Sequence, residues 1–226
     1  FFILIQKIII YTFSNYIISN SKGSAEILKK FILNKNIEYI YNPYLKEINK
    51  VKPISNKRNV ILFVGRFVKQ KGIIYLLKSY KLLLKQNYKY KLILIGDGPE
   101  KKKIKTFIKK NKFSNQIKII DWRNNLSHYY FKSKIFVLPS IYEGFPNALL
   151  EAMSTGLPCI ASDCSGNNDI IEHNLNGKLF KVKDINTLSN LILELLGDYK
   201  GRKRISVESK KKALMYDRDN IFSQWN

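Results

Sequence analysis

Beyond residue 59 the chain alternates short apolar runs with stretches in which apolar residues recur at helical spacing. Continuous runs such as VILFV (60–64) and KLILIG (91–96) are typical of strands buried on both faces of a parallel sheet. Further strands are predicted at residues 116–121, 134–140, 158–162 and 177–182. Helices are predicted at residues 73–86, from Pro99 onward, and at 125–133, 146–154, 167–172, 186–196 and 202–215. Strands that alternate with helices predict βαβ units, so the expected fold class is α/β, with a parallel sheet flanked by helices.

The first 58 residues have a different pattern. Residues 2–13 are an apolar stretch with helical character, and a predicted helix at 25–33 lies between predicted strands at 15–19 and 37–41. Residues 44–58 are polar and basic, which is typical of a linker. No apolar run reaches 18 residues without interruption, so no transmembrane helix is predicted. The start of the chain also lacks the basic region and small-residue cleavage site of a signal peptide.

The net charge of +23 raises the hypothesis of a nucleic-acid partner. The chain contains 34 Lys but only 6 Arg, and readers of phosphates and bases usually use the guanidinium fork as well. The Lys excess also extends over the whole chain together with many Ile and Asn residues, as in a product of an A/T-rich genome. We therefore expect no nucleic-acid partner and keep contact with an anionic membrane as a secondary hypothesis.

Cysteine and histidine are too scarce for several kinds of site. Cys159 and Cys164 are the only cysteines, and His128 and His173 the only histidines, so neither a disulfide framework nor a metal site is expected. Cys164 has no histidine paired with it in the sequence, which favours an inert thiol over a nucleophile. His173 lies in a polar stretch and is interpreted as a solvated loop residue.

Ligands of open parallel sheets bind beyond the carboxyl ends of the strands, so the loops after the strands are the candidates for chemistry. The loop at 65–72 offers Gly65 for a turn, with Arg66 and Lys71 as cations that either grip a diphosphate or are solvated. The loop at 95–100 has two glycines and a proline, which favours a structural turn. The loop at 162–169 has Gly166, whose following amides could face an anion.

The loop at 139–158 carries two carboxylates on either side of a helix start. Glu143 precedes the helix that begins at Pro146, and Glu151 lies about 7 Å along the axis from Pro146. Because free N–H groups at a helix start favour an anion, the layout fits the sugar, diphosphate and ribose of a nucleotide sugar. The alternative is that Glu143 caps the helix and Glu151 faces water, and the spacing alone leaves both open.

Four segments occur in a characteristic order: VGRFVKQKG, LILIGDGPE, VLPSIYEGFPNALLEAMSTGLPCIASDCSG and NGKLF. Together they resemble the C-terminal half of glycosyltransferase family 4, whose members are retaining, nucleotide-sugar-dependent enzymes with the two-domain GT-B fold. The resemblance covers residues 57–196, and EGFPNALLEA is its most specific part. It implies that residues 59–200 form a Rossmann-like donor-binding domain and 44–58 a linker. Residues 1–43 would be the remnant of an N-terminal, acceptor-side domain, and 201–226 a C-terminal helix that returns toward that domain.

The resemblance also implies roles for individual positions. It implies catalytic roles for Arg66, Lys71 and Glu143, with the two cations on the donor diphosphate and the carboxylate on the donor-sugar hydroxyls. The full donor-binding set that it implies is Gly65, Arg66, Lys71, Asp121, Trp122, Arg123, Glu143, Gly144, Phe145, Pro146, Asn147 and Glu151. In this set Glu151 would hold the ribose, and the stretch from Asp121 to Arg123 would hold the base. No metal or other cofactor is implied, and the donor is expected to be a UDP-sugar.

The expected function is transfer of a sugar from a nucleotide-diphosphate sugar to a glycan or lipid-linked acceptor in surface polysaccharide or lipopolysaccharide biosynthesis. The expected location is the cytoplasm, at the inner face of the membrane. Because only about 50 residues precede the linker, we expect an incomplete, donor-binding part that is inactive alone. The competing hypothesis is a basic nucleic-acid- or membrane-binding module that is indifferent to Glu143→Ala. A sugar-nucleotide epimerase would need a histidine or acid pair that the loops lack.

Overall fold

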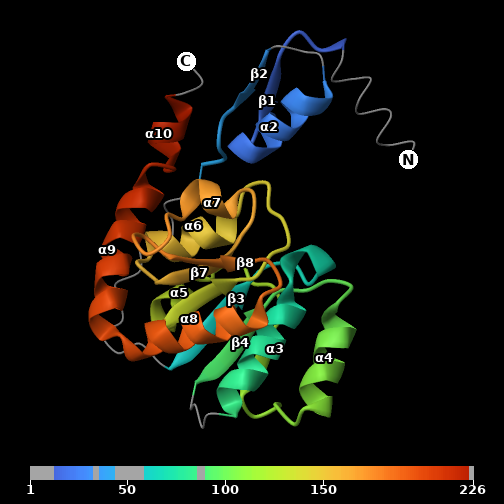
Figure 1. Cartoon of the computed structure of the whole chain (residues 1–226), viewed down its shortest axis with the longest axis vertical. Coiled ribbons are helices and arrows are strands. Elements are labelled where there is room, and N and C mark those ends of the chain that lie inside the picture. Colours follow the sequence, from blue (N-terminus) through green and yellow to red (C-terminus); the bar gives the residue numbers. More distant parts are fainter. Residues whose placement is uncertain (1–12, 33–35, 44–58, 86–89, 224–226) are drawn as a thin grey trace.

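The computed structural model of the chain describes residues 13–32, 36–43, 59–85 and 90–223 (Figure 1). Its main body is a six-stranded sheet with the order β5-β4-β3-β6-β7-β8, in which all neighbouring strands are parallel. The strands are β3 (Val60–Val64), β4 (Lys91–Ile95), β5 (Ile117–Ile120), β6 (Ile135–Leu138), β7 (Cys159–Asp163) and β8 (Lys178–Lys181). The predicted α/β class with a parallel sheet is therefore confirmed.

Helices cover both faces of this sheet. The helices of the main body are α3 (Ile73–Leu84), α4 (Lys101–Lys110), α5 (Ser127–Lys132), α6 (Asn147–Ser154), α7 (Asn167–Ile170), α8 (Ile185–Gly197), α9 (Tyr199–Leu214) and α10 (Arg218–Phe222). Helix α3 packs against α8, and α6 packs against α9. The two central strands β3 and β6 are buried along their whole length, which explains why their sequences are continuously apolar. Since all strands run in parallel, the loops that follow β3, β6 and β7 meet at one edge of the sheet.

The glycines of the loop after β4 have a packing role. A Cβ atom on Gly96 would lie 1.9 Å from the carbonyl oxygen of Gly65, and one on Gly98 would lie 2.7 Å from that of Phe67. The backbone N–H of Phe67 donates to the carbonyl of Asp97 at 2.7 Å. The loops after β3 and β4 are thus held backbone to backbone, in agreement with the structural interpretation of the loop at 95–100.

A small N-terminal unit lies above the main body in Figure 1. It consists of β1 (Ile17–Ser19), α2 (Lys22–Phe31) and β2 (Ile37–Tyr39), and its two strands form a separate parallel sheet. Its core contains Ile17, Ala25, Ile32 and Ile37. The predicted apolar stretch at 2–13 falls almost entirely outside the described residues, as does the whole of the predicted linker at 44–58. The domain boundaries stay predictions.

Two local predictions need correction. The helix predicted at 202–215 is confirmed as α9, but the stretch 201–226 is not a single helix, because α9 ends at Leu214 and α10 begins at Arg218. The side chain of Asp217 accepts a hydrogen bond from the backbone N–H of Asn220, so it caps a new helix where the old one ends. The loop after β3 also contains a short 3₁₀ helix, η2 (Lys69–Lys71), which the sequence pattern did not predict. Across the described part of the chain, no helix is both long and apolar enough to cross a bilayer.

Candidate functional site

An ion pair joins the loops that follow the neighbouring strands β3 and β6. The ammonium Nζ of Lys71 lies 2.6 Å from Oε1 of Glu143, and the Glu143 side chain is only 4% exposed. The hydroxyl of Ser140 donates to the same carboxylate oxygen at 2.5 Å. Gln70 strengthens the junction, since its side-chain amide donates to the carbonyl of Tyr142 at 2.9 Å. The structure thus brings together two of the three predicted catalytic residues, Lys71 and Glu143.

The loop after β7 contacts the backbone of Glu143 and of its neighbour Gly144. The backbone N–H of Glu143 donates to the carbonyl of Ser165 at 3.2 Å. Gly166 has a φ of +84°, and a Cβ atom there would lie 2.7 Å from the carbonyl oxygen of Gly144 and 2.9 Å from that of Glu143. Only glycine combines this backbone conformation with this close approach. Gly166 therefore sets the position of the Glu143 loop, a role more specific than the anion-facing turn that the sequence suggested.

A buried amide fixes the loop after β7 in turn. The side-chain Nδ2 of Asn167 donates to the carbonyl of Ser162 at 3.0 Å and lies 3.4 Å from Sγ of Cys164. Burial raises the pKa of Cys164 to about 11, so its thiol stays protonated and is a poor nucleophile. The prediction of an inert Cys164 agrees with this environment. Asn167 was not predicted from the sequence, because its contacts with Ser162 and Cys164 exist only in the folded loop.

Backbone N–H groups follow Glu143 in the same loop. Pro146 has no N–H group and forms the N-cap of α6, whereas the N–H of Asn147 donates to the carbonyl of Phe145 at 3.1 Å. The expectation that the Asn147 N–H faces a ligand therefore needs correction, since this group is bonded internally. Within the described residues, the N–H groups of Gly144 and Phe145 make no hydrogen bond. They are the donors of this loop that a ligand could use.

Three aromatic rings from distant segments meet at Phe145. Its ring centroid lies 5.3 Å from that of Tyr41 and 5.9 Å from that of Tyr216, and the two tyrosine rings lie 5.1 Å apart. Tyr41 follows β2, and Tyr216 lies between α9 and α10. Burial raises the pKa of Tyr216 to about 12, and its hydroxyl donates to the carbonyl of Asp169 at 3.2 Å. The N-terminal unit and the C-terminal helices therefore both contact the loop that carries Glu143.

Glu151 lies on α6 and is partly buried. The hydroxyl of the fully buried Tyr130 donates to its Oε2 at 2.8 Å. Burial raises the pKa of Glu151, while the Tyr130 hydrogen bond opposes this shift. The alternative in which Glu151 is a fully solvated helix residue is therefore wrong. Tyr130 could not be predicted from the sequence, because this contact joins residues 21 positions apart on two helices.

This burial predicts an unusual stability profile for Glu151→Gln. Because the folded-state pKa is raised above the ordinary value of 4.5, stability due to the bound proton is present below that value and is lost as pH rises through the folded-state pKa. We expect Glu151→Gln to be more stable than the native chain at pH 8, with the difference vanishing toward pH 4. Urea unfolding at several pH values measures this, and the exposed Glu172→Gln is the matched control. A difference that is the same at every pH would contradict the burial argument.

The predicted base-binding stretch lies apart from the Glu143 loop, after the edge strand β5. Asp121 is exposed and pairs with Lys101, whose Nζ lies 2.7 Å from its Oδ1 and 3.1 Å from Oδ2 of Asp97. Trp122 is 57% exposed. A groove of about 350 Å³ is lined here by Lys101, Lys105, Lys118, Ile119, Ile120, Asp121, Arg123 and Tyr129. Lys101 was not predicted as a site residue, and only the folded sheet edge reveals it.

The other predicted cation, Arg66, is exposed and makes no ion pair within the described residues. Gly65 lies next to it, and its N–H donates to the carbonyl of Ile95 at 3.0 Å. Arg66 is therefore free to meet an anion, whereas Lys71 would have to share its charge between Glu143 and a ligand. In the described ranges, no three His, Cys, Asp or Glu side chains are grouped so that they could hold a metal ion.

A family model described as "Glycosyl transferases group 1" matches residues 46–212. An uncharacterized glycosyltransferase of Haemophilus influenzae is 30% identical over 221 residues, which cover 97% of this chain and 62% of that protein. The lipopolysaccharide 1,6-galactosyltransferase of Salmonella typhimurium is 33% identical over 177 residues, which cover 75% of this chain and 49% of that protein. The chain thus spans about half to three fifths of the length of these relatives.

The crystal structure of HepE from Anabaena, in complex with UDP and glucose, superposes with a TM-score of 0.89 at 21% identity. The superposition covers 98% of this chain and 65% of that one, and at this identity it shows the fold alone. The parallel sheet, the loops at its carboxyl edge and the match over residues 46–212 lead to one assignment. The chain belongs to the glycosyl transferases group 1 family of GT-B proteins.

Proposed function

We propose that the chain is the donor-binding part of a retaining glycosyltransferase that uses a nucleotide-diphosphate sugar. The observation that carries the proposal is the Lys71–Glu143 pair beside the unbonded N–H groups of Gly144 and Phe145. A cation, a carboxylate and two backbone donors at the carboxyl edge of a parallel sheet match a diphosphate joined to a sugar. Family membership supports the reaction class, and the UDP in the HepE structure favours a UDP-sugar.

In the proposed reaction the bond between the anomeric carbon and the diphosphate oxygen breaks, and its electron pair leaves with the diphosphate. Arg66, Lys71 and the two free N–H groups stabilise the charge that develops there, so no metal ion is required. Glu143 accepts hydrogen bonds from the sugar hydroxyls and Glu151 from the ribose hydroxyls. The acceptor hydroxyl attacks from the face that the diphosphate leaves, which retains the configuration, and its proton passes to the departing diphosphate.

The acceptor that we propose is a glycan or a lipid-linked sugar of surface polysaccharide or lipopolysaccharide synthesis, at the inner face of the cytoplasmic membrane. Several relatives support this class, including the Salmonella lipopolysaccharide enzyme. The described N-terminal unit comprises β1, α2 and β2 and offers little surface for an acceptor. We therefore propose that this chain alone binds donor without completing transfer.

Isothermal titration calorimetry with UDP and UDP-sugars tests the proposal. The Glu143→Gln variant makes this test specific for the sugar part of the donor. Removing the charge of Glu143 should weaken UDP-sugar binding about tenfold, the loss of a hydrogen bond to a charged group. UDP lacks the sugar, so its affinity should stay the same or rise, because Lys71 is released from its partner. The neutral side chain still accepts the hydrogen bond of Ser140.

Absence of binding at millimolar UDP, GDP and their sugars, with folding verified by circular dichroism, would contradict the proposal. The competing nucleic-acid hypothesis predicts a different result. It requires RNA binding that falls steeply with salt and does not respond to Glu143→Gln.

A further inference from the structure

A dense group of positive charges lies on one helix of the main body and on the segment that follows it. Between Pro99 and Ile120 the chain has eight Lys and a single acidic residue, Glu100. Most of these lysines belong to α4, whose ten residues extend about 15 Å. This density exceeds that of the chain as a whole, which carries a net +23 over 226 residues. The excess is therefore a local feature as well as a general bias in composition.

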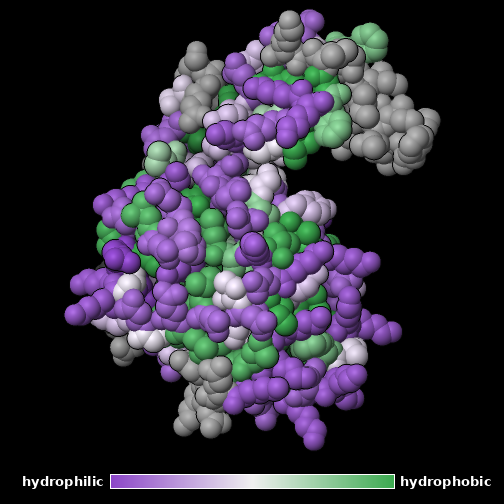
Figure 2. Space-filling view, viewed as in Figure 1, coloured by the Kyte–Doolittle hydropathy of each residue, from purple (hydrophilic) through white to green (hydrophobic). Residues whose placement is uncertain are grey.

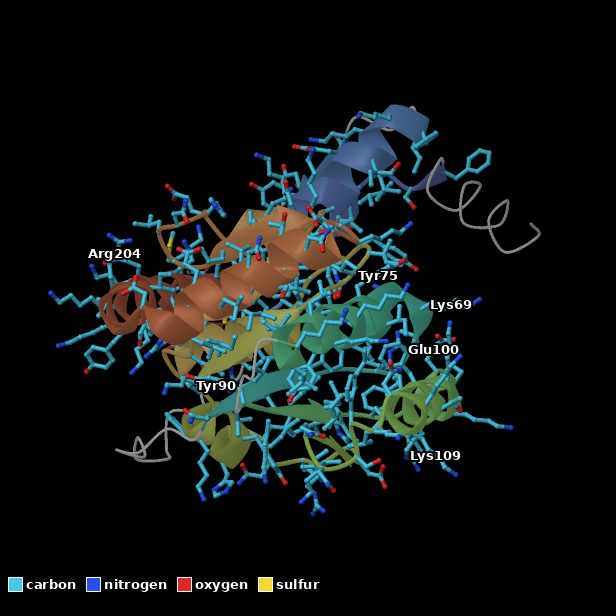
Figure 3. The ribbon with its side chains drawn as sticks, turned by 60° about the horizontal axis from the view of Figure 1, so that its bottom comes forward. Lys69, Tyr75, Tyr90, Glu100, Lys109 and Arg204 are labelled. Carbon is cyan, nitrogen blue, oxygen red and sulfur yellow. The ribbon has the colours of Figure 1, made fainter. Side chains whose placement is uncertain are left out.

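The lysines of α4 form a continuous outer face. Ile104 and Ile108 are buried against the sheet, whereas the exposed side of the helix carries mostly lysine. We define the α4 lysine face as Lys102, Lys105, Lys109 and Lys110, which are all exposed. Figure 3 shows Lys109 pointing outward from this helix. A shallow groove of about 550 Å³ follows the same side of the helix and is lined by three lysines of this face together with Lys101.

The ammonium groups of this face lack a direct partner in the described part of the chain, while Lys105 acts on Asp97 at longer range. None of its four ammonium groups makes a hydrogen bond or an ion pair within the described residues. Helix α9 is also basic. There Arg202 donates to the carbonyls of Leu195 and Leu196 and Lys211 pairs with Glu208 at 2.8 Å, whereas other exposed cations of α9 make no ion pair within the described residues. The α4 lysine face is therefore a candidate for an external anionic partner, and α9 provides the comparison.

We propose that the α4 lysine face docks the protein on an anionic phospholipid surface. Clusters of four to eight basic residues on a helix are attracted to anionic lipids by about 1 kcal/mol for each Lys or Arg near the surface. A nucleic-acid partner fits less well, because the four side chains of the face are all lysine and lack the planar guanidinium fork of arginine. Lysine ammonium groups are point charges, which suits a surface of mobile phosphate headgroups.

The position of the face on the molecule agrees with the proposed function. This is the one part of the inference that rests on that proposed function. In Figure 1, α4 lies on the side of the main body toward which the space below the N-terminal unit opens, and Figure 2 shows this space as a notch in the surface. The N-terminal unit and the main body meet at a junction that includes Asn20 and Gly144. A Cβ atom on Gly144 would be 3.6 Å from Oδ1 of Asn20. Docking on α4 would bring the junction near a lipid-linked acceptor.

The test compares two variants with the same change in net charge. The first carries Lys102→Glu, Lys109→Glu and Lys110→Glu, and the control carries Lys200→Glu, Lys203→Glu and Lys210→Glu on exposed positions of α9. Co-sedimentation with phosphatidylglycerol-containing vesicles should fall at least tenfold for the first variant and less than threefold for the control. Pure phosphatidylcholine vesicles should bind neither protein. UDP calorimetry should be unchanged in both variants, so vesicle binding is judged independently of donor binding.

Three results would overturn the proposal. Equal losses in both variants would show that only net charge matters. Displacement of the protein from vesicles by millimolar inorganic phosphate would point to a small-anion site instead of a lipid surface. Binding of single-stranded RNA that depends on the α4 lysines, without vesicle binding, would assign the face to nucleic acid.

Discussion

Lys71→Met is expected to lower the free energy of unfolding by about 3 kcal/mol, the scale for removing one partner of a buried ion pair. The Glu143 side chain is 4% exposed, and among the described residues the Ser140 hydroxyl would be the one side-chain donor left to its carboxylate. The same substitution should weaken UDP binding at least tenfold, because a cation for the diphosphate is lost. Urea unfolding measures the first effect and titration calorimetry the second.

The control for this result is Lys78→Met, at an exposed position of α3. It removes the same charge from the chain and should change neither quantity. The double variant Lys71→Met, Glu143→Gln should regain part of the stability, because no uncompensated charge is left in the site. If Lys71→Met were as stable as the native chain, the ion pair would have no energetic role and the site assignment would lose its main support.

Gly166→Ala is expected to be strongly destabilising. The new Cβ atom would lie 2.7 Å from the carbonyl of Gly144 and 2.9 Å from that of Glu143, at a φ of +84° that side chains rarely adopt. We expect a loss of about 3 kcal/mol, which for a chain of this size corresponds to a fall in Tm of about 6–12 °C. The shift of the Glu143 loop should also reduce UDP-sugar affinity at least tenfold.

Gly197→Ala makes the same chemical change where a Cβ atom would have no neighbour within 4 Å. This residue ends α8, so alanine should leave stability unchanged or raise it by up to about 1 kcal/mol through helix propensity. Thermal unfolding followed by circular dichroism compares the two variants. A Gly166→Ala protein with native Tm and native UDP-sugar affinity would show that the loop after β7 does not position Glu143.

The strand pattern could be predicted because burial on both faces leaves a direct trace in the sequence. The runs at residues 60–64 and 91–96 are apolar without interruption, and each is a strand of the parallel sheet. Parallel strands in turn place their loops at one edge, so the meeting of Lys71 and Glu143 followed from topology. The end of α9 agrees with the predicted helix, whereas α10 was not predicted, because its start depends on the cap that Asp217 forms.

The residues that support the site could not be predicted from the sequence. Tyr130 and Asn167 act through contacts that exist only once helices and loops are packed, and neither forms a motif with its neighbours. Whether Glu151 is buried or solvated depends on which side of α6 packs against the rest of the protein. Residue spacing cannot decide this for a helix of eight residues with apolar positions on several sides. Lys101 was hidden among the other lysines of α4, which look alike in the sequence.

Because the rings of Tyr41, Phe145 and Tyr216 contact one another, residues 59–200 do not form a structurally independent unit. A boundary drawn at residues 59 and 200 would remove two of the rings and leave the third, beside Glu143, uncovered. An exchange of residues 59–200 between related proteins would therefore have to include the end of β2 and the turn between α9 and α10. The structural unit is therefore defined by these ring contacts, and it includes residues from three separate stretches of the chain.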